Sequence, residues 1–269
     1  MTKKHATYDS RFWIGLAGWL PLSLIGCASA MAVSQVDPAA SLQTGLCSIS
    51  TAEAVPGAPR YDAIDLGDWQ QGGRARSGNW SIDPGGQSVL QALNGAPTSF
   101  HSARKFIDVT IAGTFEVFDA SDDDFIGFVF GYEAHGGDES RADFLLFDWR
   151  GGEQSSAAEG FTLSRVAGPM SNSAGIGTPW WGHTHPSIDV LATDLGAGKG
   201  WRHGRKHEFE LSYLKDRIRI VIDGLQVFDL PGEFESGQFG FYNFSQARTR
   251  YSLLGASPAG ARMGVATLR

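Results

Sequence analysis

Apolar and polar residues alternate along much of the chain after residue 63, most clearly from Ile107 to Val117. Within that stretch every second residue is apolar or glycine, and polar residues fill most of the positions between them. A helix buries a stripe that recurs every three to four residues, whereas a strand turns successive side chains to opposite faces. The period of two therefore predicts a β-strand over this segment.

Further segments downstream show a strand pattern, either as alternation or as short, nearly continuous apolar runs. They are Phe125–Tyr132, Phe144–Trp149, Phe161–Val166, Phe209–Tyr213, Ile218–Ile222, Leu225–Phe228, Gln238–Phe244 and Tyr251–Leu254. Asp223 and Gly224 separate two of them, and an Asp-Gly pair favours a two-residue hairpin turn because both positions tolerate positive φ. No segment has the pattern of a long amphipathic helix. The chain is predicted to be all-β, an antiparallel β-sandwich of jelly-roll type.

The N-terminus has the features of an export signal. Lys3, Lys4 and Arg11 precede an apolar stretch that ends near residue 26 and is followed by small residues. This is the order of a secretory signal peptide, and the stretch is too short for a convincing membrane span. Two exits stay open: a lipobox ending at Cys27, which would then be acylated, or ordinary cleavage near Ala30. We expect an exported protein (extracellular, cell-surface or periplasmic), with an outer-membrane lipoprotein as the lipobox branch.

The predicted organisation is a signal peptide over 1–32, a flexible lead-in over 33–60, a β-sandwich over 61–255 and a C-terminal tail over 256–269. Cys27 and Cys47 are the two cysteines of the chain, so no internal disulfide is expected once Cys27 is acylated or removed. A formal net charge of −7 argues against nucleic-acid binding, which needs a basic surface. Membrane contact is expected only through a lipid on Cys27.

The main chemical candidate is the run Asp122, Asp123 and Asp124, with Asp119 just upstream. Adjacent carboxylates repel one another unless a cation or hydrogen-bond donors compensate them, and calcium prefers six to eight oxygen ligands. On an extended segment Asp122 and Asp124 would point to the same side, and Asp123 to the other. The run predicts either a calcium site or a solvated acidic turn, and the residues alone leave both open.

Three other groups carry alternative interpretations. His183, His185 and Asp189 have residue types that bind zinc, although their spacing is equally typical of a structured loop. The basic segment 201–207 (WRHGRKH) is either a solvated loop or a patch for an anionic ligand such as a sulfated glycan. Tryptophans could stack on sugar rings or belong to the core; Trp180 and Trp181 are our candidate ligand contacts, with Trp69, Trp80 and Trp201 also considered.

The segment Gly113–Glu133 (GTFEVFDASDDDFIGFVFGYE) resembles the thrombospondin C-terminal, L-type-lectin-like domain. Matches in the same order are Asn79–Gly95, Ser140–Arg150, Pro179–His185 and Phe239–Gln246, so the resemblance covers about Tyr61 to Leu254. It implies a concanavalin/laminin-G-like sandwich and calcium as a cofactor. Two features depart from the family: Asn243 stands where its members have a cysteine, and the sequence has no run of Asp-rich calcium repeats.

We therefore expect an exported, non-catalytic, calcium-associated adhesion or ligand-binding module with an extracellular glycan or matrix-like protein as partner. The sequence has neither a G-x-S-x-G nucleophile elbow nor an H-E-x-x-H motif. Because sandwich folds also carry hydrolases, the alternative is a secreted carbohydrate-active enzyme of the glycoside hydrolase kind. A third possibility is a structural surface protein without a small ligand.

Overall fold

The computed structural model describes residues 61–133, 143–152, 158–168 and 178–259. The predicted signal peptide with Cys27 and the lead-in over 33–60 lie outside the described residues. No helix in the described part is both long and apolar enough to cross a bilayer.

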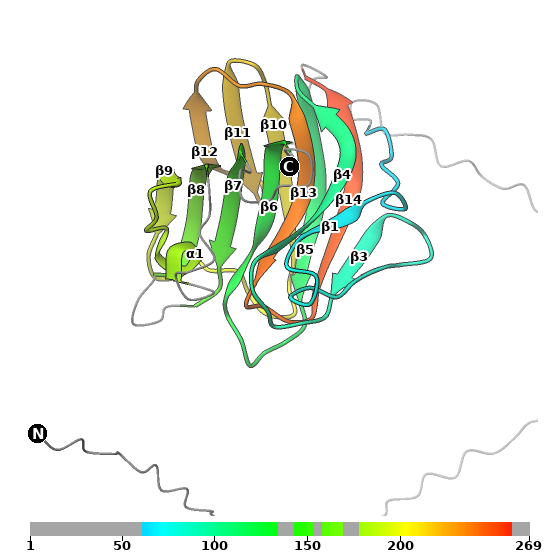
Figure 1. Cartoon of the computed structure of the whole chain (residues 1–269), viewed down its shortest axis with the longest axis vertical. Helices are drawn as coiled ribbons and strands as arrows, with labels where there is room; N and C mark the ends of the chain where they lie inside the picture. Colours follow the sequence, from blue (N-terminus) through cyan, green and yellow to red (C-terminus); the bar gives the residue numbers. More distant parts are fainter. Residues whose placement is uncertain (1–60, 134–142, 153–157, 169–177, 260–269) are drawn as a thin grey trace, which may run out of the picture. The chain divides into compact units, whose positions relative to one another are not determined.

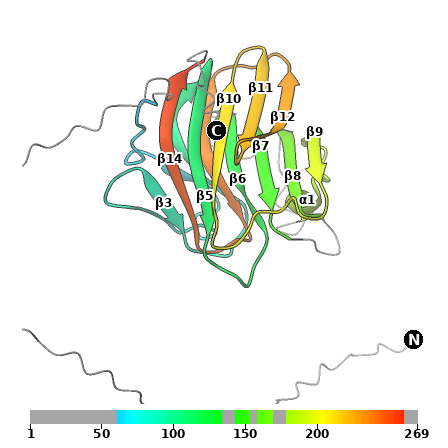
Figure 2. The ribbon, with the colours of Figure 1, turned by 180° about the vertical axis from the view of Figure 1, so that it is seen from behind.

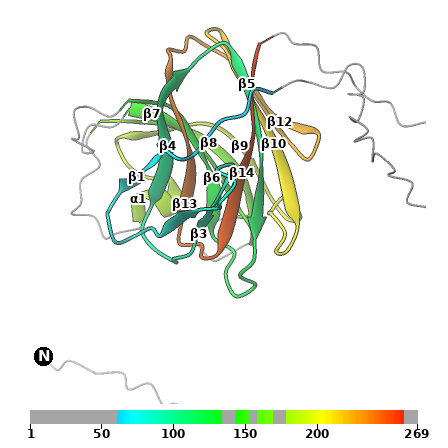
Figure 3. The same ribbon diagram turned by 90° about the vertical axis from the view of Figure 1, so that its right-hand side faces the viewer.

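Two seven-stranded sheets pack face to face, as Figures 1 and 3 show, and every strand pairing is antiparallel. The first sheet, sheet 1, has the order β1-β4-β13-β6-β7-β8-β9. Its strands are β1 (Gln70–Gly73), β4 (Thr98–Phe106), β13 (Gly237–Phe244), β6 (Phe125–Glu133), β7 (Asp143–Arg150), β8 (Gly160–Ala167) and β9 (Ile188–Leu195).

The second sheet, sheet 2, is seen best from behind in Figure 2 and has the order β12-β11-β10-β5-β14-β3-β2. Its strands are β12 (Leu225–Pro231), β11 (Arg217–Ile222), β10 (Lys206–Tyr213), β5 (Val109–Val117), β14 (Thr249–Pro258), β3 (Ser88–Gln91) and β2 (Trp80–Ile82). Each sheet joins strands that are far apart in sequence. Because the two sheets are antiparallel and pack face to face, the predicted all-β antiparallel sandwich is confirmed.

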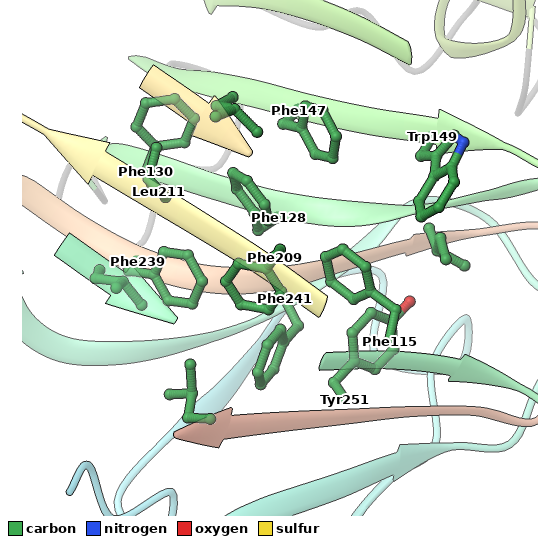
Figure 4. Packing of buried hydrophobic residues seen from close by; sticks show 14 of the residues in the cluster. Phe115, Phe128, Phe130, Phe147, Trp149, Phe209, Leu211, Phe239, Phe241 and Tyr251 are labelled. Carbon is green, nitrogen blue, oxygen red and sulfur yellow. The ribbon is translucent and has the colours of Figure 1, made fainter. Parts of the chain in front are cut away.

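The core between the sheets is rich in aromatic rings, because alternate residues of the central strands point inward. Phe115 stacks on Phe209 with ring centroids 4.7 Å apart, and Phe128 stacks on Phe147 at 4.7 Å. Figure 4 shows these rings filling the space between the strands. Rings in offset contact add stabilisation beyond the area that they bury, so this core can hold the sandwich without a disulfide.

The predicted hairpin at Asp223-Gly224 is confirmed. The two residues have φ values of 50° and 78°, and the flanking Ile222 and Leu225 pair across β11 and β12. Both positions lie in the left-handed region, which is where Asp and Gly are tolerated best.

Two strand boundaries differ from the prediction. β5 begins at Val109 rather than Ile107, because Asp108 has a φ of 56° that interrupts the extended backbone. β14 runs from Thr249 to Pro258, past the predicted end at Leu254 and past the domain boundary at 255. The first residues of the predicted tail are therefore part of the last strand.

One short helix, α1 (Thr178–Gly182), lies on the outer face of sheet 1. Its two tryptophans pack against a second apolar cluster on that face, which includes Phe125, Val129 and Leu146. The middle of sheet 1 is thus covered on both faces, which explains why β6 is apolar at almost every position.

Candidate functional site

The loop Phe118–Asp124 joins β5 to β6 at one end of the sandwich, the lower end in Figure 1. Phe125, the first residue of β6, pairs with Arg150 at the end of β7 and with Phe244 at the end of β13. Because neighbouring strands are antiparallel, the turns that follow β7 and β13 meet the aspartate loop at the same edge.

The carboxylates of Asp122, Asp123 and Asp124 converge in this loop. Each offers an oxygen, and the three oxygens lie within 4.8 Å of one another. We expected Asp123 to point away from the other two, and that expectation is wrong because residues 122–124 do not form an extended strand. Asp119 lies outside this group, since its Oδ1 accepts hydrogen bonds from the amide and hydroxyl of Ser121 at 3.0 and 2.6 Å.

Contacts from distant segments fix the backbone of the aspartate loop. The amides of Gly151 and Gly152 donate to the Asp123 carbonyl at 2.9 and 3.2 Å, and Trp201 Nε1 donates to the Asp124 carbonyl at 3.0 Å. The Asp124 amide donates to Gln246 Oε1 at 3.0 Å. These partners hold the three carboxylates together against their mutual repulsion.

Burial disfavours the ionised form of two of these carboxylates. Burial, with a smaller contribution from the neighbouring Asp122, raises the pKa of Asp124 to about 7, and burial likewise raises the pKa of Asp122. The nearest buried cation is Arg150, whose Nη2 lies 3.7 Å from Asp124 Oδ1. Arg150 pairs with one of the three carboxylates, so a bound cation would relieve the repulsion that remains among them.

The donor set suits calcium. The converging atoms are carboxylate oxygens. Asn94 supports them: its Nδ2 donates to Asp122 Oδ2 at 2.5 Å, and its Oδ1 accepts a hydrogen bond from Ser245 Oγ at 3.3 Å. Hard oxygen ligands in an irregular loop favour calcium over zinc, which prefers nitrogen and sulfur.

A buried polar network links this loop to the core. Gln91 Nε2 donates to Asn243 Oδ1 at 2.5 Å, and Asn243 Nδ2 donates to the Tyr251 hydroxyl at 2.9 Å. Gln91 Nε2 also lies 3.4 Å from the carbonyl of Gln246, whose side chain holds Asp124. Asn243 is therefore a hydrogen-bonded member of the core.

Trp180 and Trp181 are half-buried on the outer face of sheet 1. Trp180 stacks on Phe144 with centroids 6.4 Å apart, and Trp181 meets Phe125 edge-on at 5.4 Å. The guanidinium of Arg150 lies 4.6 Å from the Trp181 ring, a cation–π contact. Of the other tryptophans considered from the sequence, Trp69 and Trp201 are buried core residues.

The predicted zinc ligands are not brought together. His183 Nε2 lies 2.6 Å from Asp148 Oδ2, and His185 Nδ1 accepts the Ser187 amide at 3.1 Å. Among the described residues, the three aspartates form the one group of three or more histidine, cysteine or acidic side chains with converging ligand atoms. Burial alone would lower the pKa of His183, but Asp148 outweighs it and raises that pKa.

The opposite end of the sandwich has a groove of about 930 Å³. Its lining includes Phe144, Tyr213, Phe234 and several carboxylates. Asp143, one of these, is tied to Arg165 by two hydrogen bonds, at 3.3 and 3.1 Å. This groove was not expected from the sequence, because residues from several strands and from the segment between β12 and β13 line it together.

Sequence reasoning also missed Arg150 and Gln246, two buried polar residues that support the aspartates. A signal for Arg150 was present, since Asp148 and Arg150 are charged residues at alternate positions of an otherwise apolar strand. Gln246 had no comparable signal, because its role depends on a contact across 122 residues of sequence.

The comparisons with known proteins agree with this architecture. The family model "Thrombospondin C-terminal region" matches residues 75–169. Human thrombospondin-3 is 25% identical over 197 residues, 65% of this chain and 20% of that protein. Human cartilage oligomeric matrix protein is 25% identical over 189 residues, 62% of this chain and 24% of that protein. The chain thus spans a fifth to a quarter of the length of these relatives.

Solved structures with a similar fold include carbohydrate-binding module CBM66 from Bacillus subtilis, with a TM-score of 0.49 and 14% identity, covering 71% of this chain and 95% of that one. The exoplasmic domain of VIP36, in a calcium- and glycan-bound form, gives a TM-score of 0.43 and 11% identity, covering 72% and 85%. The sandwich assignment rests on the strand pairing, and the resemblance to the thrombospondin family rests on the sequence matches. Residues 75–169 thus match the thrombospondin C-terminal region, and relatives at 25% identity extend this similarity over 62–65% of the chain.

Proposed function

We propose that this protein is an exported, non-catalytic adhesion or ligand-binding module that calcium stabilises. The observation that carries the proposal is the convergence of Asp122, Asp123 and Asp124 within 4.8 Å, in a loop fixed by distant contacts. These three carboxylates would hold the ion. Asp119, bonded to Ser121, would shape the loop rather than contact the ion.

Calcium would act on stability. Without a cation the three carboxylates repel one another, and burial penalises the charge of Asp124. A cation that binds only the folded state raises the free energy of unfolding, by about 2.7 kcal/mol when its concentration is a hundred times the dissociation constant. The ion would also fix the loop that joins the two sheets at this end.

The partner is proposed to be an extracellular glycan or protein. The family relatives include a protein named for the cartilage matrix, which supports a role outside the cell. Trp180 and Trp181 remain the candidate ligand contacts, because both residues are only partly buried on the outer face of sheet 1. Export through the signal segment 1–32, with a lipid on Cys27 as the anchored form, belongs to the same proposal.

Isothermal titration calorimetry with calcium chloride tests the ion directly. We expect wild-type protein to bind calcium and Asp122→Asn with Asp124→Asn to lose that binding. Asp119→Asn is the matched control, since it removes one carboxylate of the same loop that lies outside the converging group. Equal calcium affinity in wild type and the double variant would overturn the site.

A panel of polysaccharides, added to the calcium-loaded protein, tests the ligand-binding role. Binding without release of reducing sugar is the expected result. Release of reducing sugar would instead favour a carbohydrate-active enzyme on the same fold.

A further inference from the structure

We propose that a cluster of basic residues beside the aspartate loop binds a sulfated polysaccharide. The cluster comprises Arg202, His203, Arg205, Lys206 and Arg248, and we refer to it as the basic rim. This inference deepens the proposed function, because it names a ligand class and the surface that receives it.

Two turns from distant parts of the chain form the basic rim on either side of the end of β5. The Gly204 amide donates to the Val117 carbonyl at 2.8 Å, and the Phe118 amide donates to the Arg248 carbonyl at 3.0 Å. Consecutive residues of one strand end therefore hold the β9–β10 turn and the β13–β14 turn. This places Arg248 next to the segment 202–206, from which it is separated by more than forty residues in sequence.

The buried side chain of His207 fixes the backbone of the β9–β10 turn. His207 Nε2 accepts the Arg202 amide at 2.9 Å, and its Nδ1 lies 2.8 Å from Asp223 Oδ2. Since Nε2 accepts, Nδ1 carries the proton and donates to Asp223. The turn thus presents its cations from a defined backbone, which lowers the entropic cost of binding.

The side chains of the basic rim are exposed to solvent. Arg202, His203, Lys206 and Arg248 are exposed, and no carboxylate of the described residues lies within ion-pair distance of Arg202, Lys206 or Arg248. Arg205 is held by Asp223 at 2.9 Å. The spread of cations along two adjacent turns suits an extended polyanion better than a single small anion.

The carboxylates around the basic rim also bear on the proposal. Asp119 lies nearest: its bonds from Ser121 lower its pKa most, and Arg248 and His203 add smaller contributions. Glu116 lies opposite Lys206 in the strand register, and Asp122 is the next acid along the loop. Calcium on the aspartate loop would cancel much of this negative charge, so calcium should strengthen polyanion binding at the basic rim.

The negative net charge of the chain makes binding to a polyanion an informative test. The whole chain carries a formal charge of −7, so non-specific electrostatics oppose binding to a polyanion. Any attraction to sulfate groups must then come from a local cluster. Insertion of this surface into a membrane is not favoured, because the basic rim contains no large apolar side chain that could enter the bilayer.

The experiment measures binding of the full chain to immobilised dextran sulfate, with unmodified dextran as the uncharged control. In calcium we expect binding to dextran sulfate only, weakened steeply by salt and several-fold by a chelator. Arg202→Glu with Arg248→Glu should reduce the affinity at least about tenfold, since it reverses two contacts. Arg104→Glu with Lys215→Glu, the same charge change at the other end of the strands, should leave it near the wild-type value after correction for net charge.

The proposal is overturned if the Arg202/Arg248 variant, folded by circular dichroism, binds dextran sulfate like wild type, or if wild type does not bind it in calcium. Basic-rim-dependent binding to vesicles containing phosphatidylserine, without binding to dextran sulfate, would assign the surface to membranes and would also overturn it. Dextran sulfate binding by protein whose melting is unaffected by calcium would refute the calcium site and leave the basic rim standing.

Discussion

Trp201 Nε1 donates a hydrogen bond to the main-chain carbonyl of Asp124 at 3.0 Å, from a position 77 residues further along the chain. Trp201 is 3% exposed, and Gly151, the glycine that binds the Asp123 carbonyl, has room for no Cβ because this indole would meet it at 2.5 Å. The tryptophan therefore ties the aspartate loop to the β7–β8 turn. Trp201, which has no carboxylate, therefore helps to position the carboxylates of the loop.

Trp201→Phe keeps most of the ring volume and removes this donor. We expect a loss of roughly 1–2 kcal/mol of stability, because a buried carbonyl loses its partner. We also expect a smaller effect of calcium on the melting temperature.

Trp149→Phe is the matched control for that change. Trp149 is equally buried and donates to the Lys199 carbonyl at 2.7 Å rather than to the aspartate loop. It should lose similar stability while keeping the full calcium effect. If calcium raised the melting temperature of Trp201→Phe as much as that of wild type, the Trp201 hydrogen bond would not be needed for calcium binding.

Gly224→Val tests the hairpin between β11 and β12. Gly224 has a φ of 78°, a conformation that a β-branched residue adopts only with strain. We expect a loss of roughly 1–3 kcal/mol in urea unfolding. Gly224→Asn, which tolerates this conformation better, should lose clearly less, and equal losses would contradict the turn geometry.

The ion pair of His183 with Asp148 should make the free energy of unfolding depend on pH. The pKa of His183 in the folded protein is raised by Asp148, so the folded state holds a proton that the unfolded chain releases at lower pH. The stabilisation is fully present below the unfolded pKa of about 6.5 and is lost as the pH rises through the folded pKa.

Wild type should therefore exceed His183→Gln in stability at pH 6, by roughly 1–2 kcal/mol, and by less at pH 8. The measurement is urea unfolding at a series of pH values. His185→Gln removes the neighbouring ring that accepts the Ser187 amide and keeps the His183–Asp148 pair, so it should retain the pH-dependent contribution of that pair. A constant gap between wild type and His183→Gln would mean that the ion pair does not form.

Trp181→Ala tests the cover on sheet 1. The ring meets Phe125 and Phe244 edge-on and lies over Arg150. We expect a loss of about 2 kcal/mol from apolar area and the cation–π contact. Unfolding like that of wild type would show that the ring does not support this face, and would leave ligand contact as its role.

The sequence predicted the strands whose apolar residues alternate, and it missed those with mixed patterns. β4 buries His101 and Ser102 beside its apolar residues, so its polar composition hid it. β9 is an edge strand with most of its residues exposed, which removes the alternation that marks a half-buried strand.

At the site, the sequence identified the aspartates but not their geometry. Asp123 joins its neighbours in a loop whose carbonyls accept hydrogen bonds from glycines after β7 and from an indole after β9. Such contacts depend on the fold and leave no local pattern. The family resemblance, by contrast, could be recognised from short motifs, and the match over residues 75–169 confirms it.

The melting temperature of the wild-type protein in calcium and in chelator tests the central claim most directly. We expect calcium to raise it and chelator to lower it, with Asp122→Asn and Asp124→Asn together removing the difference, because only the folded loop brings these carboxylates together. Equal melting temperatures of the wild type in calcium and in chelator would contradict the account and reduce the aspartate loop to a solvated turn.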